Sequence, residues 1–174
     1  LAGYLLGKAL VEKGYYVVNS ETYSAETRGG FSRSDLIVFT SEEEVDLITV
    51  RRADVAVFMY KDQMYAYADL VKPDAKLVML DSTFIEKPAR SWPRVVSVPF
   101  TRLAEEATGT HRVANVYMLG VFSYVTGLVD IDTLRRVLEA SVNPRWREVN
   151  LKALQAGYEY ASRNLERVDL GLKG

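Results

Sequence analysis

The chain has 174 residues, with 22 Lys and Arg against 23 Asp and Glu, and a net charge of −1. This length fits one domain with a sizeable core, and the balanced charge excludes a strongly basic nucleic-acid-binding or membrane-surface protein. The absence of cysteine excludes disulfides, a thiol nucleophile and thiolate ligands for iron–sulfur clusters or structural zinc, and the single histidine excludes a His-rich metal site.

Helices and strands alternate through the first half of the chain. Apolar residues recur at i, i+4 spacing between residues 1 and 10, which predicts an amphipathic helix that Gly14 ends. We predict strands at 15–19, 35–40, 54–60, 75–81 and 94–100, a short helix or irregular crossover at 45–53, and a helix at 61–71. The continuous apolar run at 54–60 is typical of a central strand covered on both faces.

The second half of the chain is predicted to be helical. Residues 110–127 are apolar nearly all round, as in a buried helix. Residues 130–141 and 145–168 form two further helical patterns, the first opening with acidic residues suited to a helix N-terminus. The pattern predicts one α/β domain over residues 1–174: a Rossmann-like, three-layer fold with a mostly parallel sheet and C-terminal helices.

Polar segments follow several of the predicted strands. Ligands of open α/β folds bind at the carboxyl ends of strands, so we expect the loop at 19–30, the segment after residue 60 and the segment 81–83 to lie at one edge. The first loop holds Glu26, Arg28, Gly29 and Gly30. Two interpretations stay open: a Glu–Arg ion pair that braces a turn, or a contact loop for an anionic ligand or a partner chain.

Other polar residues have a structural interpretation. Asp81, with Ser82 beside it, could bind a ligand hydroxyl, but we favour a cap on the following turn. Asn115 lies in an apolar helix, where a buried amide must be hydrogen-bonded. His111 is predicted to start a helix with local hydrogen bonds, and the 11 tyrosines are assigned mainly to packing.

No long apolar segment and no secretory signal is visible, which predicts a cytoplasmic protein, and the 26% charged residues are typical of a thermophile.

Four segments together resemble the gamma subunit of 2-oxoacid:ferredoxin oxidoreductases, a domain that also occurs fused in single-chain pyruvate:ferredoxin oxidoreductases. These segments are "NSETYSAETRGGFSRSDLIVFTSEEEV", "RRADVAVFM", "LVKPDAKLVMLDST" and "ANVYMLGVF". Thr22 and Ser24 depart from the family pattern, which has serine and glycine there. The residues that match it are Tyr23, Glu26, Arg28, Gly29 and Gly30 in the loop, and Asn115 and Gly120 in the later helix.

The resemblance implies a non-catalytic subunit that binds no cofactor or metal of its own. In the family, the complex oxidatively decarboxylates a 2-oxoacid on thiamine diphosphate and magnesium, passes electrons through iron–sulfur clusters to ferredoxin, and releases an acyl-CoA. The expected partners are thiamine-binding alpha and beta subunits and an iron–sulfur delta subunit. The loop residues Tyr23, Glu26, Arg28, Gly29 and Gly30 would contact a partner or coenzyme A, and Asp81, Ser82 and Asn115 are secondary candidates.

The resemblance also implies a strand and a glycine-rich turn ahead of residue 1, because family members begin that way. An isolated subunit of this kind could self-associate. Two other functions stay open: a stand-alone nucleotide-binding α/β enzyme and a purely structural scaffold subunit. The first is disfavoured because the second strand of such an enzyme ends in an acidic residue, whereas the corresponding strand here ends in Asn19.

Overall fold

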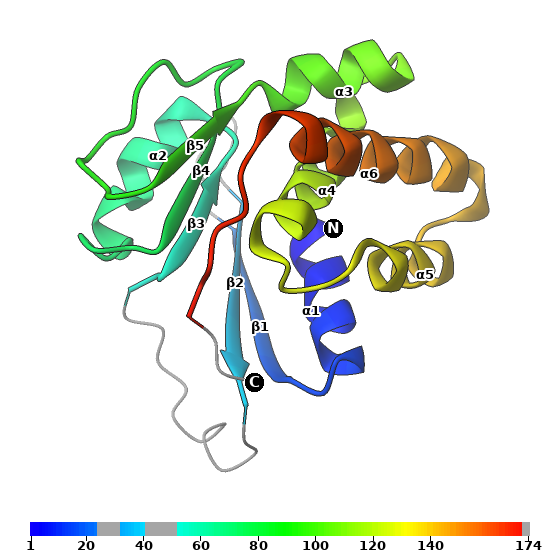
Figure 1. The fold of residues 1–174 in the computed structure, drawn as a ribbon, viewed down its shortest axis with the longest axis horizontal. Coiled ribbons are helices and arrows are strands. Elements are labelled where there is room, and N and C mark those ends of the chain that lie inside the picture. The colour runs from blue at the N-terminus through cyan, green and yellow to red at the C-terminus, as the bar shows by residue number, and fades with distance from the viewer. Residues whose placement is uncertain (24–31, 41–51, 172–174) are drawn as a thin grey trace.

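The computed structural model describes residues 1–23, 32–40 and 52–171 (Figure 1). The first half contains α1 (Ala2–Glu12), β1 (Tyr16–Tyr23), β2 (Ser32–Phe39), β3 (Val55–Phe58), α2 (Lys61–Tyr67), η2 (Ala68–Leu70), β4 (Leu77–Asp81) and β5 (Val95–Val98). The second half contains α3 (Phe100–Thr108), η3 (His111–Val113), α4 (Ala114–Thr126), α5 (Ile131–Ser141) and α6 (Pro144–Asn164). The predicted α/β fold with C-terminal helices is confirmed.

The described strands form two sheets. Strands β3, β4 and β5 pair side by side in that order, and all are parallel. Strands β1 and β2 form an antiparallel pair that runs in register from Tyr16 opposite Phe39 to Tyr23 opposite Ser32. The mostly parallel character of the predicted fold therefore holds for β3–β5, and β2 is the antiparallel exception.

Strand β1 is longer than the sequence predicted. We expected it to end at Asn19 and a loop to follow, but it continues to Tyr23, and β2 begins at Ser32 rather than Asp35. Residues 19–22 are polar and exposed, so they show no apolar alternation. They are held by the backbone ladder with β2, which no local sequence pattern reveals. The predicted crossover at 45–53 lies mostly outside the described residues.

Strand β4 is the buried centre of the three-stranded sheet. All five of its residues are buried. Leu77 and Met79 pack into the core cluster that also holds residues of α1, α4 and α6, whereas Val78 and Leu80 pack into a second cluster with Met64 of α2. Alternate residues of a strand point to opposite faces, so the sheet has a helical layer on each side. This is the three-layer arrangement that the sequence predicted.

Two helices of the larger core cross at very short distance. Ten of the 13 residues of α4 are buried, as the apolar pattern at 110–127 predicted. A Cβ atom on Gly120 would meet the carbonyl oxygen of Leu154, and one on Gly157 would meet that of Tyr117. These two glycines let the backbones of α4 and α6 touch, so Gly120 has a packing role independent of any ligand.

Strand β3 differs from its prediction as a fully covered central strand. Val55, Ala56 and Val57 are only half-buried, although they belong to an apolar run. Among the described residues β3 pairs with β4 alone, so it is an edge strand there.

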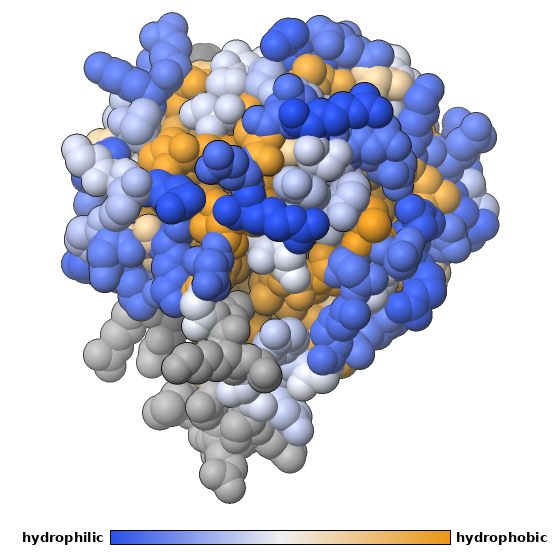
Figure 2. Space-filling model, in the orientation of Figure 1, coloured by the Kyte–Doolittle hydropathy of each residue, from blue (hydrophilic) through white to orange (hydrophobic). Residues whose placement is uncertain are grey.

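Figure 2 shows apolar surface through the middle of the face seen in Figure 1, between hydrophilic margins. No helix in the described part of the chain has the length and apolar character that a membrane span requires.

Candidate functional site at the carboxyl ends of the strands

The carboxyl ends of β1, β3, β4 and β5 lie toward the same end of the molecule. Figure 1 shows the arrow of β2 pointing opposite to that of β5, and β1 is antiparallel to β2. The first turn of α1 supports this arrangement, because a Cβ atom on Gly3 would meet the side chain of Ser34, near the start of β2. The described residues of the predicted site segments, which follow β1, β3 and β4, therefore lie at one edge of the strands.

The central part of the predicted loop lies outside the described residues. Glu26, Arg28, Gly29 and Gly30 fall in residues 24–31, and of the five matched loop residues only Tyr23 belongs to a described element, as the last residue of β1. Tyr23 is the register partner of Ser32 in β2. The ion-pair and contact-loop interpretations both remain predictions.

Asp81 joins two segments at this edge through its buried carboxylate. Oδ1 accepts a hydrogen bond from the backbone N–H of Thr83 at 3.0 Å. Oδ2 accepts from the hydroxyl of Thr101 at 2.6 Å and from the backbone N–H of Thr101 at 3.3 Å. The side chain is 0% exposed. Asp81 therefore caps the turn after β4, as the favoured interpretation predicted, and also ties that turn to the first turn of α3.

Ser82 and Thr83 complete this connection. The backbone N–H of Ser82 donates to the carbonyl oxygen of Val98 at 3.0 Å, and its side chain is exposed. The hydroxyl oxygen of Thr83 accepts from the backbone N–H of Arg102 at 3.2 Å. The backbone here is thus fixed by contacts within the chain, while the Ser82 hydroxyl is available to solvent.

An exposed aromatic pair at this edge was missed by sequence reasoning. Tyr60 directly precedes α2, and Phe84 follows the turn after β4. Their rings stack with centroids 5.4 Å apart and an angle of 25° between planes. The available signal was an aromatic residue at or soon after the end of each of two apolar runs. It is a weak signal, because it does not indicate that the two rings meet.

Asn115 and His111 lie at the start of the buried helix. Asn115 is half-buried in the first turn of α4, and its Oδ1 accepts a hydrogen bond from the backbone N–H of Val116 at 2.9 Å. His111 is exposed in η3, where the hydroxyl of Thr110 accepts from the backbone N–H of Arg112 at 3.2 Å. The local capping expected around His111 is thus made by Thr110.

Two described groups with shifted pKa values belong to the helical half. The hydrogen bond that Lys13 donates at 2.6 Å holds the pKa of Asp130 far below its usual range, and Thr133 contributes two further hydrogen bonds to the same carboxylate. Burial raises the pKa of Tyr117 to about 12, with smaller contributions from Tyr160 and Glu106. Asp130 starts α5 and Tyr117 packs against α6, so both shifts arise from structural contacts.

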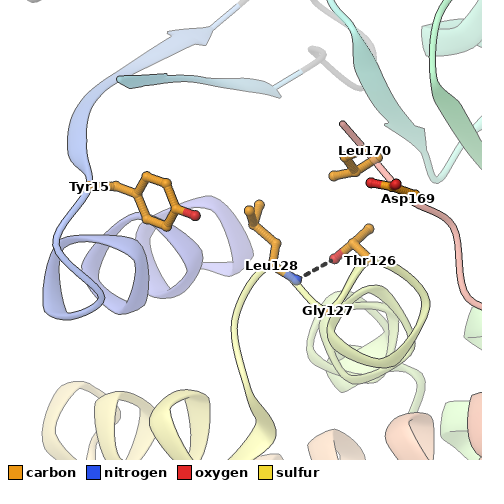
Figure 3. Close-up of a pocket in the computed structure, with 6 residues that line it drawn as sticks. All are labelled: Tyr15, Thr126, Gly127, Leu128, Asp169 and Leu170. Atoms are coloured by element: carbon orange, nitrogen blue, oxygen red, sulfur yellow. Dashed lines mark hydrogen bonds between the residues drawn. The ribbon is translucent and has the colours of Figure 1, made fainter. Parts of the chain in front are cut away.

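A small cavity lies beside the start of β1 (Figure 3). Its volume is about 130 Å³, and its lining includes Tyr15, Leu128 and Asp169. Figure 3 also shows the backbone N–H of Leu128 donating to the hydroxyl of Thr126, at 3.2 Å. Tyr15 precedes β1, so this cavity lies away from the carboxyl ends and holds only a few water-sized molecules. The described residues contain no group of three His, Asp or Glu side chains placed to hold a metal ion.

Comparisons with known proteins point to one protein family. Residues 1–160 match the family model described as pyruvate ferredoxin/flavodoxin oxidoreductase. The 2-oxoglutarate synthase subunit KorC of Methanothermobacter marburgensis is 34% identical over 165 residues, which is 91% of this chain and 88% of that protein. The shared length is nearly the whole of both chains, so the similarity is not limited to the short motif at 22–30.

The fold also occurs in solved structures of similar proteins. The gamma subunit of a keto/oxoacid ferredoxin oxidoreductase from Geobacter sulfurreducens has a TM-score of 0.75 at 24% identity, covering 93% of this chain and 90% of that one. A 2-oxoglutarate:ferredoxin oxidoreductase from Magnetococcus marinus, solved with 2-oxoglutarate, coenzyme A and succinyl-CoA, has a TM-score of 0.73 at 17% identity. Here the match covers 97% of this chain but 30% of that one, so the same fold also forms part of a longer polypeptide.

Proposed function

Because the chain belongs to the pyruvate ferredoxin/flavodoxin oxidoreductase family and its relatives of equal length are subunits of the gamma kind, we propose that it assembles into a cytoplasmic 2-oxoacid:ferredoxin oxidoreductase. The proposed reaction is oxidative decarboxylation of a 2-oxoacid to an acyl-CoA, with electrons passed to ferredoxin. In this assignment the chain is a non-catalytic subunit. The stand-alone nucleotide-binding enzyme is disfavoured by the same relatives.

The proposed partners are thiamine-binding alpha and beta subunits and an iron–sulfur delta subunit. A chain without cysteine cannot supply thiolate ligands to a cluster, so electron transfer must use other subunits. Thiamine diphosphate and magnesium are likewise assigned to those subunits. What this chain contributes is a contact surface and, in our proposal, part of the access route for coenzyme A.

One structural observation supports the location that we propose for this contact surface. Tyr23 and Ser32 stand at the two ends of residues 24–31, and they are paired at the edge where β3 and β4 also end. We assign Tyr23, Glu26, Arg28, Gly29 and Gly30 to contact with a partner chain or with the phosphates of coenzyme A. Arginine suits this role because its planar guanidinium binds phosphate or carboxylate oxygens in a bidentate way.

The test is reconstitution of the complex with Arg28→Ala and Glu26→Ala chains. We expect weaker assembly, measured by native mass spectrometry, or a higher KM for coenzyme A with the KM for the 2-oxoacid unchanged. Arg94→Ala is the matched control, because Arg94 is exposed and forms no ion pair within the described ranges. Normal assembly and unchanged kinetics in both loop variants would remove the segment from the proposed role.

We also propose that a strand ahead of residue 1 lies between β1 and β3. The support is that β1 and β3 run in the same direction, belong to separate sheets, and place Val17, Val55 and Val57 against one core while leaving them half-buried. A parallel strand there would cover those side chains and bond to both edges. An unpaired apolar edge of this kind would also promote self-association of the isolated chain.

Hydrogen exchange tests this proposal directly. A chain extended by its native preceding residues should protect the β3 amides that do not bond to β4, relative to a chain beginning at Leu1. The amides of β4, which is already fully buried, should exchange alike in both and serve as the internal control. Equal exchange of β3 in the two chains would refute the added strand.

A further inference from the structure

The segment that follows α6 has no regular secondary structure, yet it packs along the domain in an extended course. Residues 165–171 run from the end of α6 toward the lower part of the view in Figure 1. Val168 and Leu170 are each 6% exposed, whereas Asp169 between them is exposed. This alternation is that of a strand with one buried face, although the segment pairs with no described strand. The match to the family model ends at residue 160, so the segment lies outside it.

Two hydrogen bonds fasten the segment to residues that are distant in the sequence. The backbone N–H of Val168 donates to the carbonyl oxygen of Val125, near the end of α4, at 2.7 Å. The Nζ of Lys76, just ahead of β4, donates to the carbonyl oxygen of Leu170 at 2.6 Å. The backbone N–H of Lys76 in turn donates to the carbonyl oxygen of Asp54 at 2.8 Å. The segment therefore links the helical layer to the amino end of β4.

The described contacts that hold the segment are few for seven residues. Besides the two buried side chains and the two hydrogen bonds, the guanidinium of Arg167 lies 4.4 Å from the centre of the Tyr124 ring. Packing beneath the segment is incomplete, because Asp169 and Leu170 line the cavity of about 130 Å³ beside β1 (Figure 3). Ordering each residue costs conformational entropy, and a segment with few buried contacts opens more readily than a core helix.

We propose that residues 165–171 form a clasp, which closes over the cavity beside β1 and opens while the rest of the domain stays folded. Lys76 is its latch, because an exposed and flexible side chain makes the bond to the Leu170 carbonyl and can release it without disturbing the core. Opening would uncover Val125 and remove Asp169 and Leu170 from the lining of the cavity. The clasp acts at the amino end of β4, and it would work whether or not the chain joins a complex.

The test uses the absence of cysteine from the chain, which makes a single introduced thiol a unique probe. Val168→Cys places the thiol under the clasp, and Val121→Cys places it within α4, where Val121 is 0% exposed. Cysteine packs as a small apolar side chain, so both variants should fold. We expect N-ethylmaleimide, followed by mass spectrometry, to label Val168→Cys at least about 100-fold faster than Val121→Cys without denaturant.

A second substitution, added to each cysteine variant, tests the latch. Lys76→Met keeps a long side chain but removes the donor, so it should speed the labelling of Val168→Cys about fivefold and leave that of Val121→Cys unchanged. Lys87→Met is the matched control, because Lys87 is exposed and forms no ion pair with another described residue. It should change neither labelling rate.

Three outcomes would overturn the clasp. Equal labelling of Val168→Cys and Val121→Cys, or rates that rise equally steeply with urea, would mean that the segment opens only when the whole domain unfolds. Labelling of Val168→Cys that is no faster with Lys76→Met than with Lys87→Met would remove Lys76 as the latch. If Val168→Cys does not fold, as judged by circular dichroism, Leu170→Cys is measured with the same expectations, because Leu170 is equally buried.

Discussion

Replacing Asp81 by alanine should cost much of the stability of the fold. The substitution removes the acceptor of three hydrogen bonds, from the N–H of Thr83 and from the N–H and hydroxyl of Thr101. A donor left without an acceptor in a buried site costs about 1–3 kcal/mol. The Thr101 hydroxyl can turn toward another acceptor, so we expect a total loss of about 3 kcal/mol. That is a large part of the roughly 5–15 kcal/mol available to a domain.

Urea denaturation followed by circular dichroism measures this loss. The urea concentration at the midpoint of unfolding should fall, while the slope of the unfolding free energy against urea concentration stays the same. The substitution changes the native contacts rather than the surface exposed on unfolding. Asp81→Asn keeps one acceptor oxygen and should lose less than Asp81→Ala. Glu86→Ala is the control, since Glu86 is exposed and has no hydrogen-bond partner in the part of the chain described. A loss under about 1 kcal/mol in Asp81→Ala would refute the capping role.

Three further predictions concern the helical half. Gly157→Ala should destabilise the fold by about 1–3 kcal/mol in urea denaturation, because its Cβ would meet the carbonyl oxygen of Tyr117; Ser162→Ala, exposed on the same helix, should have little effect. The folded-state pKa of Asp130 is lowered by Lys13, so its contribution to stability is present above about pH 4 and lost as the pH falls below that value. Acid titrations should therefore show a smaller loss of stability in Asp130→Asn than in the parent. Ultraviolet titration should show one tyrosine ionising near pH 12, and Tyr117→Phe should remove that step.

Elements with a strong local apolar pattern were predicted correctly from the sequence. The run at 75–81 became β4, with all five strand residues buried, and the run at 110–127 became the buried α4. In both cases the pattern records burial directly, because nearly every side chain of the element is covered. A continuous apolar run therefore indicates burial, while the length of the run and its flanking residues distinguish a strand from a helix.

Predictions that depended on spatial neighbours were less accurate. Residues 19–22 of β1 are polar and exposed, and they are strand residues only because β2 pairs with them. Residues 54–60 have the composition of a central strand, yet β3 pairs on one side in the described chain. A strand's burial depends on what lies beside it, and that neighbour can be distant in the sequence.

The candidate site shows the same limit. The aspartate, serine and threonine after a buried strand predicted the cap at Asp81, because these side chains commonly bond to the backbone of a following turn. Its second partner, Thr101, lies 20 residues further along the chain and was not predictable from local sequence. Likewise Tyr60 and Phe84 meet because β3 and β4 are adjacent parallel strands, and only the fold reveals this.

Fold and function should be separable by mutation at the carboxyl edge. The three hydrogen bonds that the Asp81 carboxylate accepts from described residues all come from within the chain, so Asp81→Ala should lower stability while the coenzyme A affinity of the folded complex changes little. Phe84 is exposed and its turn is held by the backbone, so Phe84→Ala should leave the stability nearly unchanged. The melting temperatures of the two variants measure the effect on stability, and calorimetric titration of the Asp81→Ala complex measures the coenzyme A affinity. If Asp81→Ala weakened coenzyme A binding at a temperature where the complex is folded, Asp81 would have to act on the ligand, and its role would not be structural alone.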